Sequence, residues 1–192
     1  VHNAYVNYQD EYGLTLVLGT FLFCFQLYFD FAGYTDMAIG IAGVFGFALP
    51  EKFNRPFLAH SITEFWRRWH ISLMFWLKNY LFLPLVFSLR KLGVYAVPIG
   101  LILTFLFSGL WHGIKLTFII WALIHAGIIC FEFLTSSYRS KFQKSLLFKL
   151  LGISLTFLIF SFSNIFFRSE NMPMALSIVQ RIFSPIDFIP DN

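Results

Sequence analysis

His112 is an ionisable residue in a stretch of sequence that otherwise avoids polar groups. It stands in Phe-Ser-Gly-Leu-Trp-His-Gly, with Gly109 three residues before it and Gly113 directly after it. A charged side chain in hydrocarbon costs about 2 to 3 kcal/mol on insertion scales, so an ionisable residue there usually faces a cavity or a partner. A neutral imidazole at low dielectric can accept a proton from a hydroxyl group, and the glycines let other groups come close. The alternative is a buried histidine hydrogen-bonded to a neighbouring carbonyl group.

A second histidine, His70, ends a run of aromatic and basic residues. Ser61 and Glu64 form a capping box, which predicts a helix that begins at residue 61 or 62 and in which Glu64 reaches back to the Ser61 amide. At helical spacing Arg67 and Lys78 lie nearly opposite an aromatic face, and His70 falls at the border. That face carries Phe65, Trp69, Leu73, Trp76 and Tyr80. Such a helix is typical of a membrane interface with its cations at lipid headgroups; alternatively, the cations line an internal cavity and hold an anionic substrate or cofactor.

Two carboxylates, Asp30 and Asp36, also lie within apolar sequence. Because an unpaired buried carboxylate would take up a proton, we expect both to form ion pairs within the protein and to have a structural role. The candidate partners are Arg55, Arg67 and Arg68. His125 lies in a helical run with no nearby break, which favours a histidine of the core. The sequence has no glycine-rich phosphate loop, paired cysteines or serine nucleophile elbow, which excludes most soluble enzyme classes.

The composition of the chain excludes a soluble globular protein. Of its 192 residues, 58% are hydrophobic, 21% aromatic and only 12% charged, and the mean hydropathy is +0.71, whereas an ordinary soluble domain is about 25% charged. The formal charge of +4 comes from 14 Lys and Arg scattered between uncharged runs, without the clustered basic face of a nucleic-acid-binding protein. We therefore expect an all-α, polytopic transmembrane protein.

Four apolar regions approach the roughly 20 residues that a membrane-spanning helix needs. They are residues 12–29, continued as 37–49 after an Asp-Phe-Ala-Gly break; 65–87; 92–131, with room for two spans that meet near 108–113; and about 150–167. Between 133 and 150 the loop carries only basic charges, from Arg139, Lys141, Lys144 and Lys149. The positive-inside rule places this loop in the cytoplasm, together with Arg90 and Lys91 if the intervening segments are two full passes.

Taken together, the motifs resemble the membrane-bound O-acyltransferase (MBOAT) family, most closely its bacterial branch of alginate O-acetyltransferases and D-alanyl transfer proteins. The matching pieces are FDFAGYTDMAIG at 29–40, LPEKFNRPF at 49–57, SITEFWRRWHISL at 61–73, FSGLWHG at 107–113 and FFR at 166–168. The sequence departs from the family at Lys78-Asn79, where relatives commonly have Arg-Asp, and at residues 86–89, which replace a glycine-rich, basic loop. The resemblance implies that residues 1–192 are the C-terminal portion of a single, longer transmembrane domain of MBOAT-like fold, with preceding helices absent.

The resemblance also implies a tunnel through the membrane in which an activated acyl group meets an acceptor hydroxyl. His112 matches the catalytic histidine of the family, and His70 matches a second histidine near the reaction chamber. Candidates to hold an anionic donor at the cytoplasmic mouth are Arg67, Arg68, Lys78 and Asn79. The residues expected to be structural or to line the cavity are Asp30, Asp36, Trp69 and Trp111.

We therefore expect a membrane-embedded O-acyltransferase that transfers an acetyl group from a cytoplasmic thioester to a cell-surface polysaccharide or an intermediate carrier. The expected donor is acetyl-CoA or an acyl carrier protein thioester, with no metal and no bound cofactor. The further expected partners are the lipid bilayer of the cell (inner) membrane and a periplasmic or extracellular transferase. Alternatives are D-alanyl transfer to a cell-wall polymer, a transporter or flippase component with Asp30, Asp36 and His112 on its path, or a non-catalytic scaffold.

Overall fold

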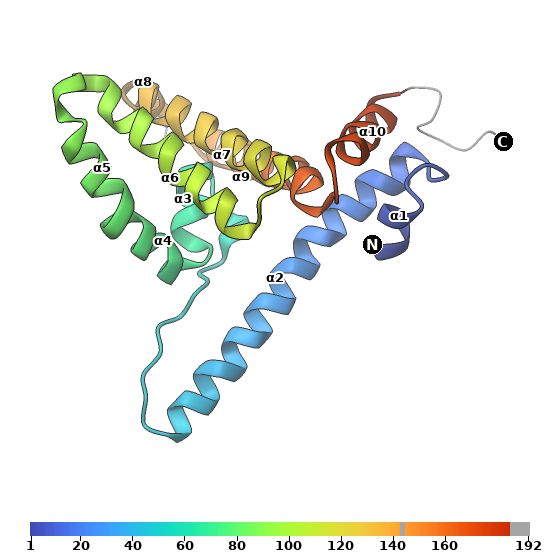
Figure 1. The fold of residues 1–192 in the computed structure, drawn as a ribbon, viewed down its shortest axis with the longest axis horizontal. Helices are drawn as coiled ribbons and strands as arrows, with labels where there is room; N and C mark the ends of the chain where they lie inside the picture. The colour runs from blue at the N-terminus through green and yellow to red at the C-terminus, as the bar shows by residue number, and fades with distance from the viewer. Residues whose placement is uncertain (143–144, 185–192) are drawn as a thin grey trace.

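The computed structural model describes residues 1–142 and 145–184, and in these residues every regular element is helical (Figure 1). Five segments of the described chain are long and apolar enough to cross a membrane: Gly13–Val44, Ile71–Ser88, Arg90–His112, Leu116–Leu134 and Leu146–Arg168. A helix bonds its own backbone polar groups, which is the condition for crossing a bilayer. The expected all-α, polytopic architecture is confirmed.

The elements follow one another as helices joined by short connections. The chain begins with α1 (His2–Val6) and α2 (Gly13–Val44), and after an extended segment come η1 (Pro56–Leu58), α3 (Ile62–Arg68), α4 (Ile71–Leu77), the π-helical turn η2 (Lys78–Phe82) and α5 (Leu83–Ser88). The remaining elements are η3 (Arg90–Tyr95), α6 (Ala96–His112), α7 (Leu116–Leu134), α8 (Ser136–Arg139), η4 (Ser140–Phe142), α9 (Leu146–Arg168) and α10 (Met172–Phe183). Lys144, expected in the basic loop, lies outside the described residues.

The first span, α2, is one continuous helix of 32 residues, so the break expected at Asp-Phe-Ala-Gly is wrong. No neighbouring atom lies within 4 Å of the position that a Cβ would take at Gly33, and the Thr35 hydroxyl bonds back to the Phe31 carbonyl at 2.8 Å. No close contact at Gly33 therefore disturbs the helical backbone, and the Thr35 bond is compatible with it. The N-terminal half of α2 packs on α9 and α10, whereas its C-terminal half extends away from the other helices (Figure 1).

The centre of the molecule is an antiparallel hairpin of α6 and α7, against which α9 packs. The two helices cross closely at Gly109, where a Cβ would lie 2.8 Å from the Phe118 carbonyl oxygen and 2.9 Å from the Ala122 Cβ. The turn expected near residues 108–113 is confirmed: α6 ends at His112, and Gly113 has φ 144°, a value that favours glycine. A buried aromatic cluster fills the space between the hairpin, α3 and α9; it includes Phe65, Trp66, Trp69, Phe105, Trp121 and Phe160.

The cationic second segment begins as predicted and then breaks. Ser61 caps α3 by accepting the Glu64 amide at 3.1 Å, although Glu64 reaches back to the His60 amide, at 2.8 Å, and not to that of Ser61. A single helical face through Tyr80 is wrong, because Trp69 is extended and His70 is left-handed, with φ 46°.

The bend at His70 is held by groups outside the helix. The Asn54 amide donates to the Arg68 carbonyl and the Ile71 amide donates to the Lys52 carbonyl, both at 2.9 Å. These two bonds satisfy backbone groups that a break would otherwise leave free. The extended segment before η1 therefore sets the angle between α3 and α4.

Candidate functional site

His112, the last residue of α6, lies among aromatic rings. Its imidazole is edge-on to Phe167, with ring centroids 5.0 Å apart, and to Trp121 at 5.5 Å, and Phe118 lies at 6.0 Å. The residue is exposed, and within residues 1–142 and 145–184 no group forms a hydrogen bond with the ring. The carbonyl-bonded alternative does not apply to this histidine. Both ring nitrogens are available for a proton-transfer partner.

His70 lies at the α3–α4 break. Its ring is perpendicular to Phe31 of α2, with centroids 4.8 Å apart. Burial, followed by the positive charges of Lys52 and His112, lowers the pKa of His70 to about 4, so the ring is neutral near pH 7. The Nδ1 atom of His70 is buried and has no hydrogen-bond partner among the described residues.

Two of the four predicted donor-binding residues line one cavity. Arg67 and Lys78 contribute to a cavity of about 400 Å³ between α3, α4, η2, α6 and α7, with Thr63, Thr104 and otherwise largely apolar side chains such as Met74. Both basic side chains are exposed where they border this cavity, and that they hold an anionic substrate or cofactor stays a prediction. A space of this kind suits a ligand that is anionic at one end and apolar at the other.

The other two predicted donor-binding residues bind within their own segment. Arg68 lies 2.5 Å from Glu64 and also donates to the Arg55 carbonyl at 3.4 Å, and Asn79 donates to the Phe75 carbonyl at 2.9 Å. Burial alone would raise the pKa of Glu64, but hydrogen bonds from the His60 amide and Arg68 hold it below its usual value. Arg68 therefore stabilises the start of α3 and does not line the cavity.

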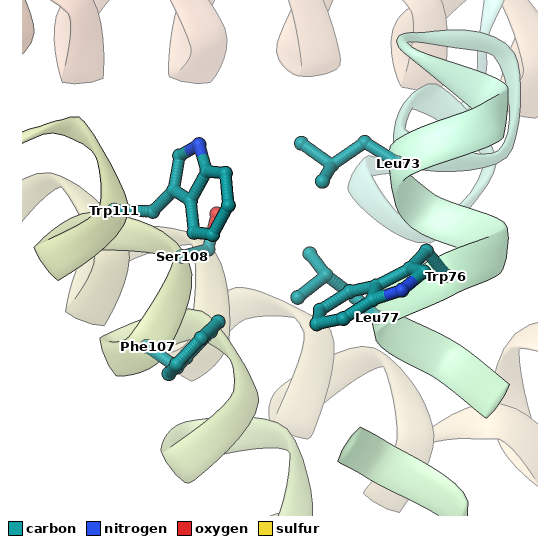
Figure 2. A pocket seen from close by; sticks show the side chains of 6 residues that line it. All are labelled: Leu73, Trp76, Leu77, Phe107, Ser108 and Trp111. Atoms are coloured by element: carbon teal, nitrogen blue, oxygen red, sulfur yellow. The ribbon is translucent and has the colours of Figure 1, made fainter. Parts of the chain in front are cut away.

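A smaller cavity of about 250 Å³ lies between α4 and α6, one turn before His112. Figure 2 shows its walls: Leu73, Trp76 and Leu77 face Phe107, Ser108 and Trp111. Trp111 thus lines a cavity, whereas Trp69 is buried in the aromatic cluster, where it stacks on Phe65 at 5.4 Å. Ser108 and His112 are four residues apart, so they lie on the same face of α6.

The two carboxylates that the sequence singles out, Asp30 and Asp36, line neither of these two cavities. Asp30 and Asp36 are exposed on the C-terminal half of α2, and within the described residues neither forms an ion pair. The expected pairing with arginines is therefore wrong: Arg68 pairs with Glu64 instead, and the C-terminal end of α2 extends away from α3 (Figure 1). His125 is a core histidine, as expected. It is fully buried, accepts the Trp66 indole N–H at 3.3 Å and lies 2.9 Å from the Ser163 hydroxyl.

Sequence reasoning did not single out Glu132. This residue of α7 accepts hydrogen bonds from the first turn of α3, at Ile62 and Thr63. Because about 70 residues separate the partners, only the folded arrangement reveals the contact. A local indication exists only in retrospect: Glu132 is an acid at the end of an apolar span.

Comparison with known proteins finds one family along most of the chain. The model of MBOAT, the membrane-bound O-acyltransferase family, matches residues 7–177. A probable alginate O-acetylase AlgI of Pseudomonas syringae pv. tomato is 41% identical over 167 residues, which are 87% of this chain and 31% of that protein. A peptidoglycan O-acetyltransferase of Helicobacter pylori is 43% identical, over 82% of this chain and 29% of that protein. A teichoic acid D-alanyltransferase of Bacillus subtilis is 39% identical, over 61% of this chain and 32% of that protein. The chain spans about a third of the length of these relatives.

Proposed function

Because the chain belongs to the membrane-bound O-acyltransferase family, we propose that it is part of an enzyme that transfers an acetyl group from a thioester to a hydroxyl of a cell-surface polysaccharide or an intermediate carrier. In this proposal residues 1–192 form the C-terminal portion of a single transmembrane domain. The names of two relatives, an alginate O-acetylase and a peptidoglycan O-acetyltransferase, favour acetyl transfer. A third, a teichoic acid D-alanyltransferase, favours D-alanyl transfer as the second candidate.

The observation that carries the proposal is the imidazole of His112 at the end of α6, with which no group in residues 1–142 and 145–184 forms a hydrogen bond. His112 takes the proton of the acceptor hydroxyl as its oxygen attacks the thioester carbonyl carbon. The new C–O bond forms, the C–S bond breaks, and the departing thiolate takes the proton from the imidazolium. A positioned general base of this kind contributes about 10² to 10⁴ in rate. His70 orients the acyl carbonyl group.

The cavity of about 400 Å³ between α3 and α7 is the proposed donor site. Arg67 and Lys78 supply positive charge for the phosphates of acetyl-CoA or of a carrier-protein phosphopantetheine arm. The apolar walls suit the uncharged part of that arm. No metal takes part in the proposed reaction.

The protein is a multi-pass membrane protein, and we assign it to the cell (inner) membrane. A cytoplasmic position for the segment between α7 and α9 is supported by Arg139 and Lys141, and by Lys149 in the first turn of α9. A thioester donor is then available on that side. A periplasmic or extracellular transferase is the proposed partner on the other side.

The test is to replace His112 by Gln in the complete gene product, with expression matched to wild type. Ester-linked acetate is released from the isolated cell-surface polysaccharide by mild base and measured, and D-alanine is measured in the same hydrolysate. We expect a fall of at least about 100-fold in one ester, with no change for His2→Gln, an exposed histidine outside the site. Retained acylation in His112→Gln contradicts the proposal, and the ester that is lost decides between the two candidates.

A further inference from the structure

Glu132 connects the end of α7 to the start of α3. Its Oε1 atom accepts the Ile62 amide and its Oε2 atom accepts the Thr63 amide, both at 2.9 Å. The Arg139 Nη1 atom lies 3.5 Å from Oε1, and the Glu132 side chain is only 10% exposed. We call this arrangement of Glu132, Arg139 and the two amides the α3 latch.

The latch satisfies backbone groups that α3 cannot satisfy by itself. The first amides of a helix have no intrahelical acceptor, and α3 has only seven residues. Ser61 accepts the Glu64 amide, and Glu132 accepts the two amides before it. The carboxylate also lies at the positive end of the helix dipole, where negative charge is favourable.

The latch also borders the proposed donor cavity. Thr63 and Arg67 of α3 line this cavity together with Ile129 of α7, which lies one turn before Glu132. On the other side of the latch, a separate cavity of about 380 Å³ is lined by Ile62, Glu132 and Arg139. The two hydrogen bonds of Glu132 therefore fix the separation of α3 and α7 at the wall between two spaces. A change in this separation would move Arg67 relative to Lys78.

We propose that Glu132 is a positioning residue for donor binding, which holds α3 against α7 so that Arg67 and Lys78 face the same cavity. This inference rests on the proposed function, which assigns the donor to that cavity. Glutamine at position 132 has one acceptor oxygen, and its NH₂ group would face the second backbone amide. Arg139 supports the carboxylate from a partly exposed position, where an ion pair contributes less.

The experiment measures acyl transfer from [¹⁴C]acetyl-CoA to polysaccharide in membranes that contain the complete gene product. For Glu132→Gln we expect the KM for acetyl-CoA to rise about ten-fold, equivalent to about 1.4 kcal/mol, while kcat changes less than about three-fold. For Arg139→Gln the same split is expected with a smaller rise in KM. Glu170→Gln, an exposed acid at the α9–α10 turn, is the matched control and should behave as wild type.

A second measurement does not depend on the donor. Thr63→Cys, with the buried Cys24 and Cys130 replaced by alanine, is labelled with a maleimide in the presence and absence of Glu132→Gln. We expect faster labelling without the carboxylate, because α3 is no longer fixed to α7. Unchanged labelling overturns the inference, as does a loss of kcat with an unchanged KM. Failure of the proposed function gives a different result. In that case the His112→Gln variant, with Glu132 unchanged, still transfers acetyl groups.

Discussion

Trp66 donates its indole N–H to Nδ1 of His125, and this bond assigns the ring proton of His125 to Nε2. Nε2 in turn donates to the Ser163 hydroxyl at 2.9 Å, and that hydroxyl donates to the Phe160 carbonyl at 2.8 Å. The chain of donors and acceptors is complete, so His125 has no lone pair left for a substrate. His112, thirteen residues earlier, has a ring with no hydrogen-bond partner among the residues that the structure describes. The same residue type thus serves as a core residue in one position and remains available for chemistry in the other.

The two buried tryptophans of the cluster should respond differently to loss of the indole N–H. Trp66→Phe leaves Nδ1 of His125 without its donor, whereas the Trp121 N–H has no acceptor among the described residues. An unpaired buried polar group costs about 1 to 3 kcal/mol. We expect Trp66→Phe to lower the apparent Tm in detergent and Trp121→Phe to leave it unchanged or raise it. Equal losses in the two variants would contradict this assignment.

The neutral state of His70 should make stability depend on pH. In the folded protein burial lowers the pKa of His70 to about 4, whereas the unfolded value is about 6.5. Between these values the unfolded chain binds the proton more tightly, so the stabilisation is complete above about pH 6.5 and is lost as the pH falls toward 4. We expect the Tm of wild type to decrease more than that of His70→Gln between pH 7 and 4. A pH-independent Tm difference would exclude this pKa.

The close crossing of α6 and α7 should not tolerate a methyl group. In Gly109→Ala the new Cβ would lie 2.8 Å from the Phe118 carbonyl oxygen, so the helices must separate near His112. Overpacking of this kind costs about 1 to 3 kcal/mol. The matched control is Gly127→Ala on α7, where no atom lies within 4 Å of the added carbon and a gain of helix propensity is expected. Thermal unfolding in detergent should separate the two variants by several degrees, and equal Tm values would argue against the close crossing.

The cavity in Figure 2 should be needed for transfer because it lies one turn from His112. In Ser108→Leu the larger side chain occupies this space, so we expect acyl transfer to fall by about ten-fold. Leu110→Phe, at a position of the same helix that is 47% exposed and does not line the cavity, should retain activity. The comparison uses ester content per amount of folded protein. Normal transfer by Ser108→Leu would show that the substrate does not enter this cavity.

Local patterns in the sequence were sufficient for several features. The capping residue Ser61 and the glycine that follows His112 act on their immediate neighbours, so helix starts and the α6–α7 turn could be predicted. The apolar surroundings of His125 likewise predict its position in the core. In each case the determining interactions lie within a few residues or depend on hydrophobicity alone.

Other features depend on partners that are distant in sequence. The break at His70 is held by Lys52 and Asn54, and the start of α3 is held by Glu132. Helical periodicity extended the helix through residue 70 because it takes no account of such bonds. Arg68 differs from its neighbour Arg67 because it pairs with Glu64, four residues earlier in the same helix. Tertiary hydrogen bonds thus set the bend at His70, whereas a contact within α3 holds Arg68.

The bend at His70 is held in place from outside, because the backbone groups of Lys52 and Asn54 bond to the residues on either side of it. Lengthening or shortening the extended segment that contains Lys52 and Asn54 would remove these two hydrogen bonds without replacing either histidine. The two short helices would then be free to straighten into one helix, and the His70 ring would lose its contact with Phe31. The position of the His70 ring therefore depends in part on backbone groups of a segment that precedes it by about 16 to 18 residues.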